Sequence, residues 1–123
     1  MITGAHGIIY SRKPEQDRVF FRDVLQLPSV DVGEGWLIFA LPPSELAVHP
    51  SRRNSIHTLY FICADIREFT ASMSARGVAC TPVQHLSWGD LTEVSLPGGG
   101  KLGVYQAHHA RPRVAARKQK GRK

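Results

Sequence analysis

The feature that most constrains the fold of this chain is an internal repeat. Residues 3–50 and residues 56–107 both show the pattern strand, helix, strand, strand, strand. Each half opens a β-prone run with a histidine, His6 in the first half and His57 in the second, and each closes its third strand with Leu-Pro. A single βαβββ unit leaves an open sheet face, so two such units are expected to pair around a cavity. The repeat predicts an α+β protein made of two βαβββ modules.

The first module is predicted to hold one helix between short strands. Its helix starts at Pro14, carries apolar residues at helical spacing, and is stopped by Pro28. β-Branched and aromatic residues mark the strands, and Gly and Pro mark the turns. The predicted strands are residues 5–11, 30–32, 36–41 and 45–49.

The second module follows a polar linker at residues 50–54. Its helix is predicted to begin near Ile66 and to end at Gly77, a residue typical of helix C-termini. The predicted strands are residues 57–63, 78–83, 91–96 and 101–106, with a glycine turn between the last two.

Composition and charge separate the domain from its tail. The chain has 123 residues and a net charge of +6, but residues 110–123 hold seven of the sixteen basic residues and no acid. We therefore predict one domain over residues 1–109 and a basic flexible tail over residues 110–123; nucleic acid is not expected as a partner, and a nucleic-acid role would rest on the tail alone. No apolar run approaches the roughly 20 residues that span a bilayer, and no secretory signal is recognisable. These observations predict a cytoplasmic protein with two reduced cysteines and no membrane contact.

Three segments resemble one known superfamily. The sequence FFRDVLQLP at residues 20–28 is similar to the end of the first helix of vicinal oxygen chelate proteins. The strand that starts at His57 resembles the opening of their second module, and residues 97–102 resemble their late turn and last strand. This superfamily includes glyoxalases, bleomycin-resistance proteins and extradiol dioxygenases. The resemblance covers residues 3–109 and implies a curved mixed sheet around a cavity.

The resemblance also implies a metal site on the facing sheets. His6 and His57 match two of the family's ligands, whereas the carboxylate positions on the last strands hold Ala47 and Gly103. Neither of these residues can bind a metal through its side chain. We therefore expect a degenerate site without a cofactor, with a divalent metal (Fe, Zn, Mn or Ni) as the alternative.

Alternation along the strands extends the candidate site, because residues two apart share a face. His49 would share a face with Ala47, but one such step lies about 6.6 Å along the strand, so joint ligation with His6 and His57 is not expected. Trp88 lies on a loop that could edge the cavity. The predicted ligand-binding residues are His6, Tyr10, His49, His57, Phe61 and Tyr105.

Two functions of different classes follow from these residues. The first is a homodimeric protein that binds or sequesters an apolar or aromatic small molecule in its cavity. The alternative is a divalent-metal-dependent dioxygenase or glyoxalase-type lyase that uses His6 and His57. Fold alone does not decide between them.

Overall fold

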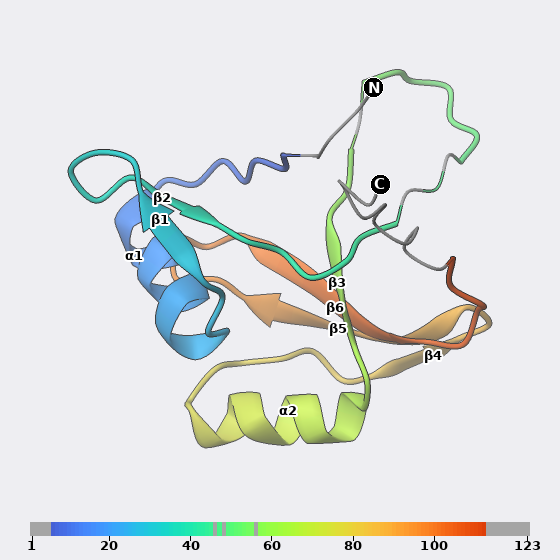
Figure 1. The fold of residues 1–123 in the computed structure, drawn as a ribbon. Helices are drawn as coiled ribbons and strands as arrows, with labels where there is room; N and C mark the ends of the chain where they lie inside the picture. Colours follow the sequence, from blue (N-terminus) through green and yellow to red (C-terminus); the bar gives the residue numbers. More distant parts are fainter. Residues whose placement is uncertain (1–5, 46, 48, 56, 113–123) are drawn as a thin grey trace, which may run out of the picture.

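The computed structural model describes residues 6–45, 47, 49–55 and 57–112 of the chain (Figure 1). Helical structure comprises α1 (Pro14–Val19), the π-helical turn η1 (Phe20–Val24) and α2 (Ile66–Ala75). The strands are β1 (Ser29–Asp31), β2 (Leu37–Phe39), β3 (Tyr60–Cys63), β4 (Gln84–Leu86), β5 (Gly89–Ser95) and β6 (Lys101–Ala107). In the described part of the chain, no helix has the length and apolar character that crossing a membrane requires.

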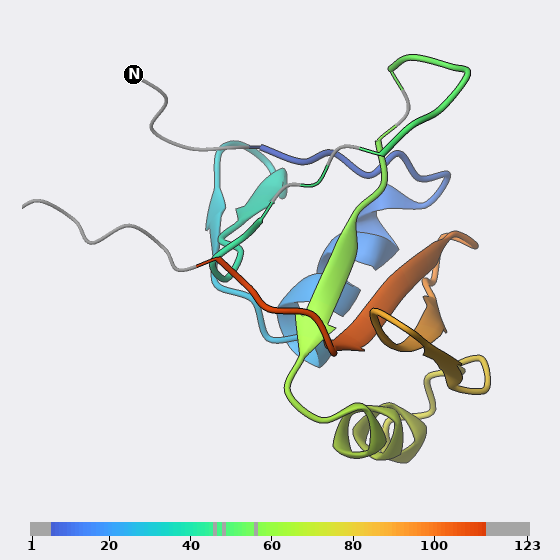
Figure 2. The same cartoon turned by 90° about the vertical axis from the view of Figure 1, so that its right-hand side faces the viewer.

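The second half of the chain forms a complete βαβββ module. Its sheet has the order β3-β6-β5-β4, with β3 parallel to β6 and the other neighbours antiparallel. The crossover from β3 runs through α2, which lies along one face of the sheet (Figures 1 and 2). The predicted α+β class is confirmed, and the order of elements in this half matches the prediction.

One face of this sheet carries the hydrophobic core. Val94 on β5 and Leu102 and Val104 on β6 are buried there, together with Phe20 and Phe21 from η1. Partly buried residues of α2 and β3 pack against the same cluster, among them Phe61, Cys63 and Phe69. The helical segments η1 and α2 therefore both cover this face, which we call the helix-covered face.

The π-helical turn explains how two successive phenylalanines are buried. The Leu25 N–H donates to the Phe20 carbonyl over 3.1 Å, a wider turn than in an α-helix. Phe20 and Phe21 lie with their rings edge to face, and Phe21 also contacts Phe39 and Phe61. The start of the motif FFRDVLQLP thus joins the first half of the chain to the core of the second.

Within its described residues, the first half does not form the four predicted strands. The predicted strand 5–11 is wrong for its described residues, because residues 6–10 are exposed and take part in no strand. The predicted strand 45–49 is absent at residues 45, 47 and 49, and the two residues between them lie outside the described ones. Among the described residues of this half, β1 and β2 alone pair, as a two-stranded antiparallel sheet. A β-prone segment needs a partner strand for its backbone hydrogen bonds, and no strand of the described chain pairs with residues 6–11.

Two strands of the second half are displaced from their predicted positions. The first begins at Tyr60 rather than His57. The predicted strand 78–83 is wrong: it contributes only an isolated bridge between Cys80 and Val94, and β4 follows it. Pro82 has no backbone N–H, so it cannot donate to a ladder at this point.

Candidate functional site

The second face of the sheet, opposite the core, is the candidate functional surface; we call it the open face. Pairing register places Gly103 and Tyr105 of β6 there, opposite Glu93 and Leu91 of β5. Tyr60 of β3 joins them, because it pairs with Gly103 in the parallel ladder. The described helices pack against the other face, so no helix covers this one.

Three aromatic rings contact one another on the open face: Tyr60 from the edge strand β3, Tyr105 from β6, and Trp88 from the β4–β5 turn. The centroids of Trp88 and Tyr105 are 4.9 Å apart and those of Tyr60 and Tyr105 are 5.8 Å apart, both with nearly perpendicular rings. Tyr60 and Trp88 also meet, with centroids 6.0 Å apart. Tyr105 is 8% exposed, whereas Tyr60 and Trp88 are 43% and 36% exposed. The buried ring therefore supports two rings that present aromatic surface to solvent.

Two glycines let the rings lie this close to the backbone. A Cβ on Gly103 would collide with the ring of Tyr60, and a Cβ on Gly89 would lie 2.7 Å from the Tyr105 ring. Gly103 is the position at which the family resemblance places a carboxylate ligand. In this chain the Tyr60 ring occupies the space that such a side chain would need.

The hydroxyl of Tyr105 is held by a histidine just beyond β6. His109 Nδ1 lies 2.9 Å from the Ala110 carbonyl, which can only accept, so Nδ1 carries the hydrogen. In the neutral imidazole, Nε2 then accepts from the Tyr105 hydroxyl over 2.9 Å. Burial, followed by the nearby Glu45 carboxylate, raises the pKa of Tyr105 and keeps the hydroxyl protonated as a donor. Glu45 in turn accepts from Arg111 Nε over 2.8 Å.

A second histidine cluster surrounds Asp90 at the start of β5. His85 Nδ1 lies 2.8 Å from one oxygen of this carboxylate, and His108 Nε2 lies 3.2 Å from the other. The hydrogen bond from His85, and to a lesser degree the contact with His108, lowers the pKa of Asp90. Through His108, the cluster links the segment that follows β6 to the start of the neighbouring strand β5.

The sequence-predicted site residues do not converge in the single chain. Of the six, Tyr105 lies on the open face; His6, Tyr10, His49 and His57 are exposed on segments outside the strands. Phe61 pairs with Val104 and packs against Phe21, so its ring lies on the helix-covered face and not beside Tyr105. The predicted common face of Gly103 and Tyr105 agrees with the register.

Sequence reasoning missed Tyr60 and His109 as members of the site. Placing the partly buried Phe61 on the core side of its strand would have put Tyr60 on the opposite face, since neighbouring residues alternate faces. No sequence pattern pointed to His109, because its contact depends on how the chain turns after β6. Ala47 is exposed and lies in no strand, so strand alternation does not assign its side chain to a face.

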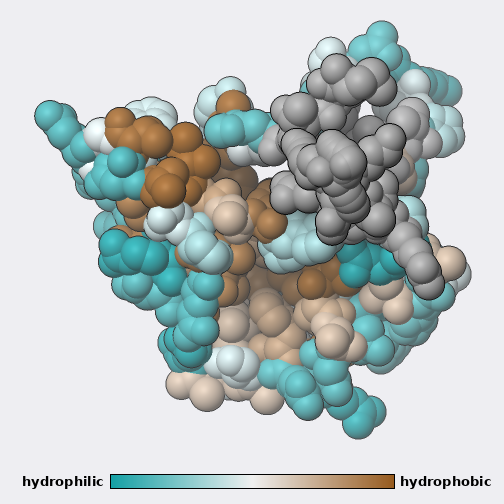
Figure 3. All heavy atoms as spheres, in the orientation of Figure 1, coloured by the Kyte–Doolittle hydropathy of each residue, from teal (hydrophilic) through white to brown (hydrophobic). Residues whose placement is uncertain are grey.

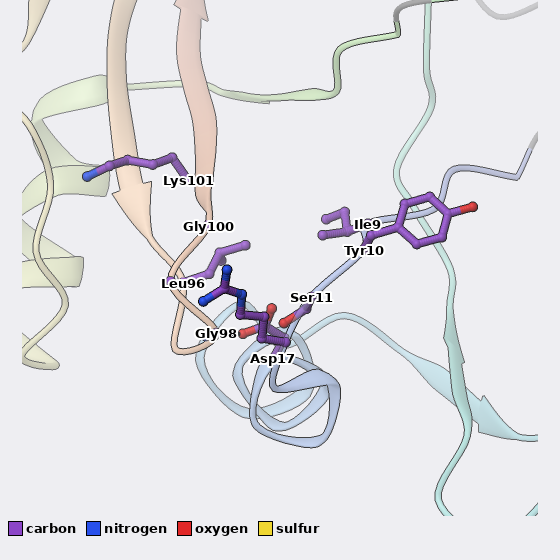
Figure 4. A pocket seen from close by; sticks show the side chains of 10 residues that line it. Ile9, Tyr10, Ser11, Asp17, Leu96, Gly98, Gly100 and Lys101 are labelled. Atoms are coloured by element: carbon purple, nitrogen blue, oxygen red, sulfur yellow. Dashed lines mark hydrogen bonds between the residues drawn. The ribbon is translucent and has the colours of Figure 1, made fainter.

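A shallow recess of about 420 Å³ lies at the other end of the molecule, between the N-terminal segment and the β5–β6 turn. Figure 4 shows Asp17 and Ser11 pointing towards Gly98, with Tyr10 and Lys101 pointing away. The Asp17 carboxylate, 5% exposed, accepts from the Gly98 N–H over 2.7 Å. A Cβ on Gly98 would collide with Ser11 and approach Asp17. These contacts hold the turn against α1 and leave this carboxylate occupied.

Metal-binding residues are dispersed in the described part of the chain. No three His, Cys, Asp or Glu side chains among residues 6–45, 47, 49–55 and 57–112 gather closely enough to hold an ion. Cys63 and Cys80 are free thiols in the core region, and burial raises the pKa of both. A raised thiol pKa disfavours the reactive thiolate.

Comparison with known proteins finds similarity in structure and not in sequence. No protein-family model matches the chain, and no curated protein sequence is significantly similar to it. The antibiotic-binding protein TnmS3 from Streptomyces sp. CB03234 is similar with a TM-score of 0.65 and 19% identity, over 87% of this chain and 98% of that one. A lactoylglutathione lyase from Agrobacterium tumefaciens matches with a TM-score of 0.61 and 14% identity, over 85% of this chain and 92% of the other.

A third similar structure is that of a protein assigned to the superfamily itself. It is a glyoxalase/bleomycin resistance protein/dioxygenase superfamily member from Sphaerobacter thermophilus, with a TM-score of 0.56 and 20% identity over 85% of this chain and 98% of that chain. At such identities the similarity concerns the fold and not the activity. The chain has the fold of the vicinal oxygen chelate superfamily, that of glyoxalases, bleomycin-resistance proteins and dioxygenases.

Proposed function

We propose that this protein binds a planar aromatic small molecule on the open face of its four-stranded sheet. The observation that carries the proposal is the aromatic cluster of Tyr60, Trp88 and Tyr105. Large aromatic side chains left partly exposed together on one sheet face are typical of binding surfaces. Tyr105 and His109 would fix the position of these rings through their hydrogen bond.

The comparisons support binding more than catalysis. TnmS3, whose structure is similar over nearly its whole length, is an antibiotic-binding protein. The lactoylglutathione lyase shows that the same fold also carries enzymes. In the present chain Gly103, which stands at an expected carboxylate position, lies beneath the ring of Tyr60. This position therefore offers an aromatic ring, which suits an aromatic ligand, in place of a metal-binding carboxylate.

The proposal includes a homodimer that completes the cavity. β3 lies at the edge of its sheet, and the β-prone residues 6–11 are unpaired within the described chain. Tyr10 is 89% exposed, and further apolar side chains are exposed on the β1–β2 hairpin (Figure 3). A second copy that pairs with these segments would satisfy their backbone groups and cover the apolar surface.

The metal-dependent alternative, a dioxygenase or glyoxalase-type lyase, would use His6 and His57. Elemental analysis of protein purified without chelators tests it, alongside a His6→Ala/His57→Ala double variant. Stoichiometric Fe, Zn, Mn or Ni that is lost in the double variant would favour the enzyme. Protein that takes up none of these ions on incubation would favour metal-free binding.

Tryptophan fluorescence tests the proposed binding surface, because the chain has two tryptophans. A Trp36→Phe variant keeps Trp88 as the only tryptophan, and a Trp88→Phe variant keeps Trp36. Titration with neutral acridine is expected to quench the first variant with saturation and to leave the second nearly unchanged. Equal quenching of both, or a linear collisional response in both, would contradict a site at Trp88.

A further inference from the structure

Beyond a preference for aromatic compounds, the open face carries a charge that points to one class of ligand. Glu93 lies on β5 directly opposite Gly103, and its side chain is exposed. Its backbone N–H and its carbonyl both bond to Thr81, so the position of the residue in the sheet is well defined. This inference rests on the proposed function, since it concerns the same face.

The carboxylate of Glu93 stands apart from most other acids of the described chain. Asp17, Asp90 and Glu45 each accept hydrogen bonds from neighbouring groups. Within the described residues, no hydrogen bond or ion pair engages the Glu93 carboxylate. The nearest cation by register is Lys101, which pairs with Ser95, one diagonal step away on the same face. Among the described residues, the Glu93 carboxylate on the open face therefore stands in no ion pair or hydrogen bond.

The Glu93 carboxylate lies between the aromatic ring of Tyr60 and a recess in the surface. Because Gly103 has no side chain, the Tyr60 ring lies over the position opposite Glu93. On the other side, a recess of about 440 Å³ is lined by residues 81–84 together with Leu91 and Glu93. A ring on one side and a carboxylate beside a recess are complementary to a flat molecule that carries a positive charge.

We infer that the open face selects planar organic cations, with Tyr60 and Trp88 against the ring system and Glu93 as the anionic partner. Aromatic faces attract cations through the ring quadrupole, and a carboxylate adds direct charge attraction. A neutral ring of the same shape would keep the stacking contact and lose both charge terms. An anionic ring would be repelled by Glu93.

Three probes that share the acridine ring system test this selectivity at pH 8: N-methylacridinium, neutral acridine and acridine-9-carboxylate. Fluorescence titration of the Trp36→Phe protein is expected to rank their affinities in that order. Glu93→Gln should weaken N-methylacridinium binding by about fivefold and leave acridine unchanged. Glu93→Lys should reverse the order of the two charged probes, and added salt should weaken only the cation.

Glu68→Gln is the matched control, since it removes the same charge from an exposed site on α2, on the other side of the sheet. It should leave all three affinities unchanged. Acridine bound as tightly as N-methylacridinium, or a Glu93→Gln variant that keeps the cation preference, would overturn the inference while leaving the proposed function intact. Failure of all three probes to bind would overturn both.

Discussion

At the scale of single residues, the absence of a side chain at Gly103 shapes the site as much as the aromatic residues do. The ring of Tyr60 covers this position, and a Cβ there would collide with it. From the sequence, Gly103 could be recognised as a missing metal ligand by resemblance. The sequence could not show that Tyr60 from the neighbouring strand occupies this space, because the position of the ring depends on the register between β3 and β6. The pairing of β3 with β6 therefore determines that position 103 presents an aromatic ring and not a metal ligand.

Replacing Gly103 with alanine is expected to displace the Tyr60 ring. The collision should lower the free energy of unfolding by about 1–3 kcal/mol, as overpacking does elsewhere. Denaturant titration measures the stability, and the near-ultraviolet circular dichroism of the aromatic cluster reports the displacement. Gly7→Ala is the control, because a Cβ at Gly7 would meet nothing within 4 Å. Equal effects of the two substitutions would contradict this packing of Tyr60 on Gly103.

Asp90 provides a pH prediction at the same scale. Its pKa is lowered chiefly by the hydrogen bond from His85, so the folded state favours the ionised carboxylate. The stability it contributes is present above the unfolded-state pKa of about 3.9 and is lost as the pH falls through the lower folded-state pKa. Wild type should therefore exceed Asp90→Asn in stability above about pH 5 and converge with it in stronger acid.

His85→Ala serves as the partner experiment, because it removes the largest cause of the shift. In the His85→Ala background, the Asp90→Asn substitution should change the stability less than it does in wild type. Urea denaturation at several pH values measures both effects. A difference between wild type and Asp90→Asn that persists unchanged below about pH 3 would show that the carboxylate charge plays no part.

At the scale of elements, a buried carboxylate joins α1 to the hairpin of β5 and β6. Asp17 comes from the first turns of the helix, and its partner Gly98 lies 81 residues later in the chain. The sequence identified the acids near Pro14 as favourable for the helix start, a local effect of the helix dipole. The long-range bond was not predictable from spacing, since it requires the helix to lie beside the turn.

Asp17→Ala should leave the Gly98 N–H without its partner. We expect a loss of about 1–3 kcal/mol in the free energy of unfolding, typical of a buried donor left unsatisfied. Asp23→Ala is the matched comparison, because Asp23 is exposed and, among the described residues, its carboxylate bonds its neighbour Arg22 alone. Its effect should be clearly smaller, because an exposed ion pair between neighbouring residues contributes little to stability. Similar losses in both variants would contradict the linking role of Asp17.

The elements also show where sequence patterns succeed. The second module was predicted in the correct order because each of its strands finds its partner within the chain. Residues 6–11 have the composition of a strand but remain unpaired in the described chain. A β pattern reports the capacity to pair and does not identify the partner. The sequence contains the local propensity of residues 6–11. What it does not contain is the identity of the strand that would supply their backbone hydrogen bonds.

At the scale of the whole molecule, the unpaired segments and the exposed apolar surface of the first half predict association. Light scattering coupled to size-exclusion chromatography should give a mass of twice 13.6 kDa. Tyr10→Asp should shift the protein towards monomer, because it places a charge in the surface proposed to be covered. Arg12→Asp is a control at an exposed polar position of the same segment. A monomeric wild type at micromolar concentration would contradict the dimer.

Association and ligand binding are expected to be linked. If a second copy encloses the open face, a ligand held there stabilises the dimer by mass action. Dissociation into monomers should then weaken binding even when every residue of the aromatic cluster is intact. The Tyr10→Asp variant is therefore expected to bind acridine less tightly than wild type, by the same fluorescence titration.

The most direct test of ligand binding on the open face is a residue-by-residue map of where an aromatic molecule binds. Amide chemical shifts of ¹⁵N-labelled protein, followed during titration with acridine, provide it. We expect the largest changes on the open face, at Tyr60, Gly89, Gly103 and Tyr105, with little change at Asp17 or Gly98. Shifts confined to the recess between α1 and the β5–β6 turn, or no saturable shifts at all, would contradict the proposal.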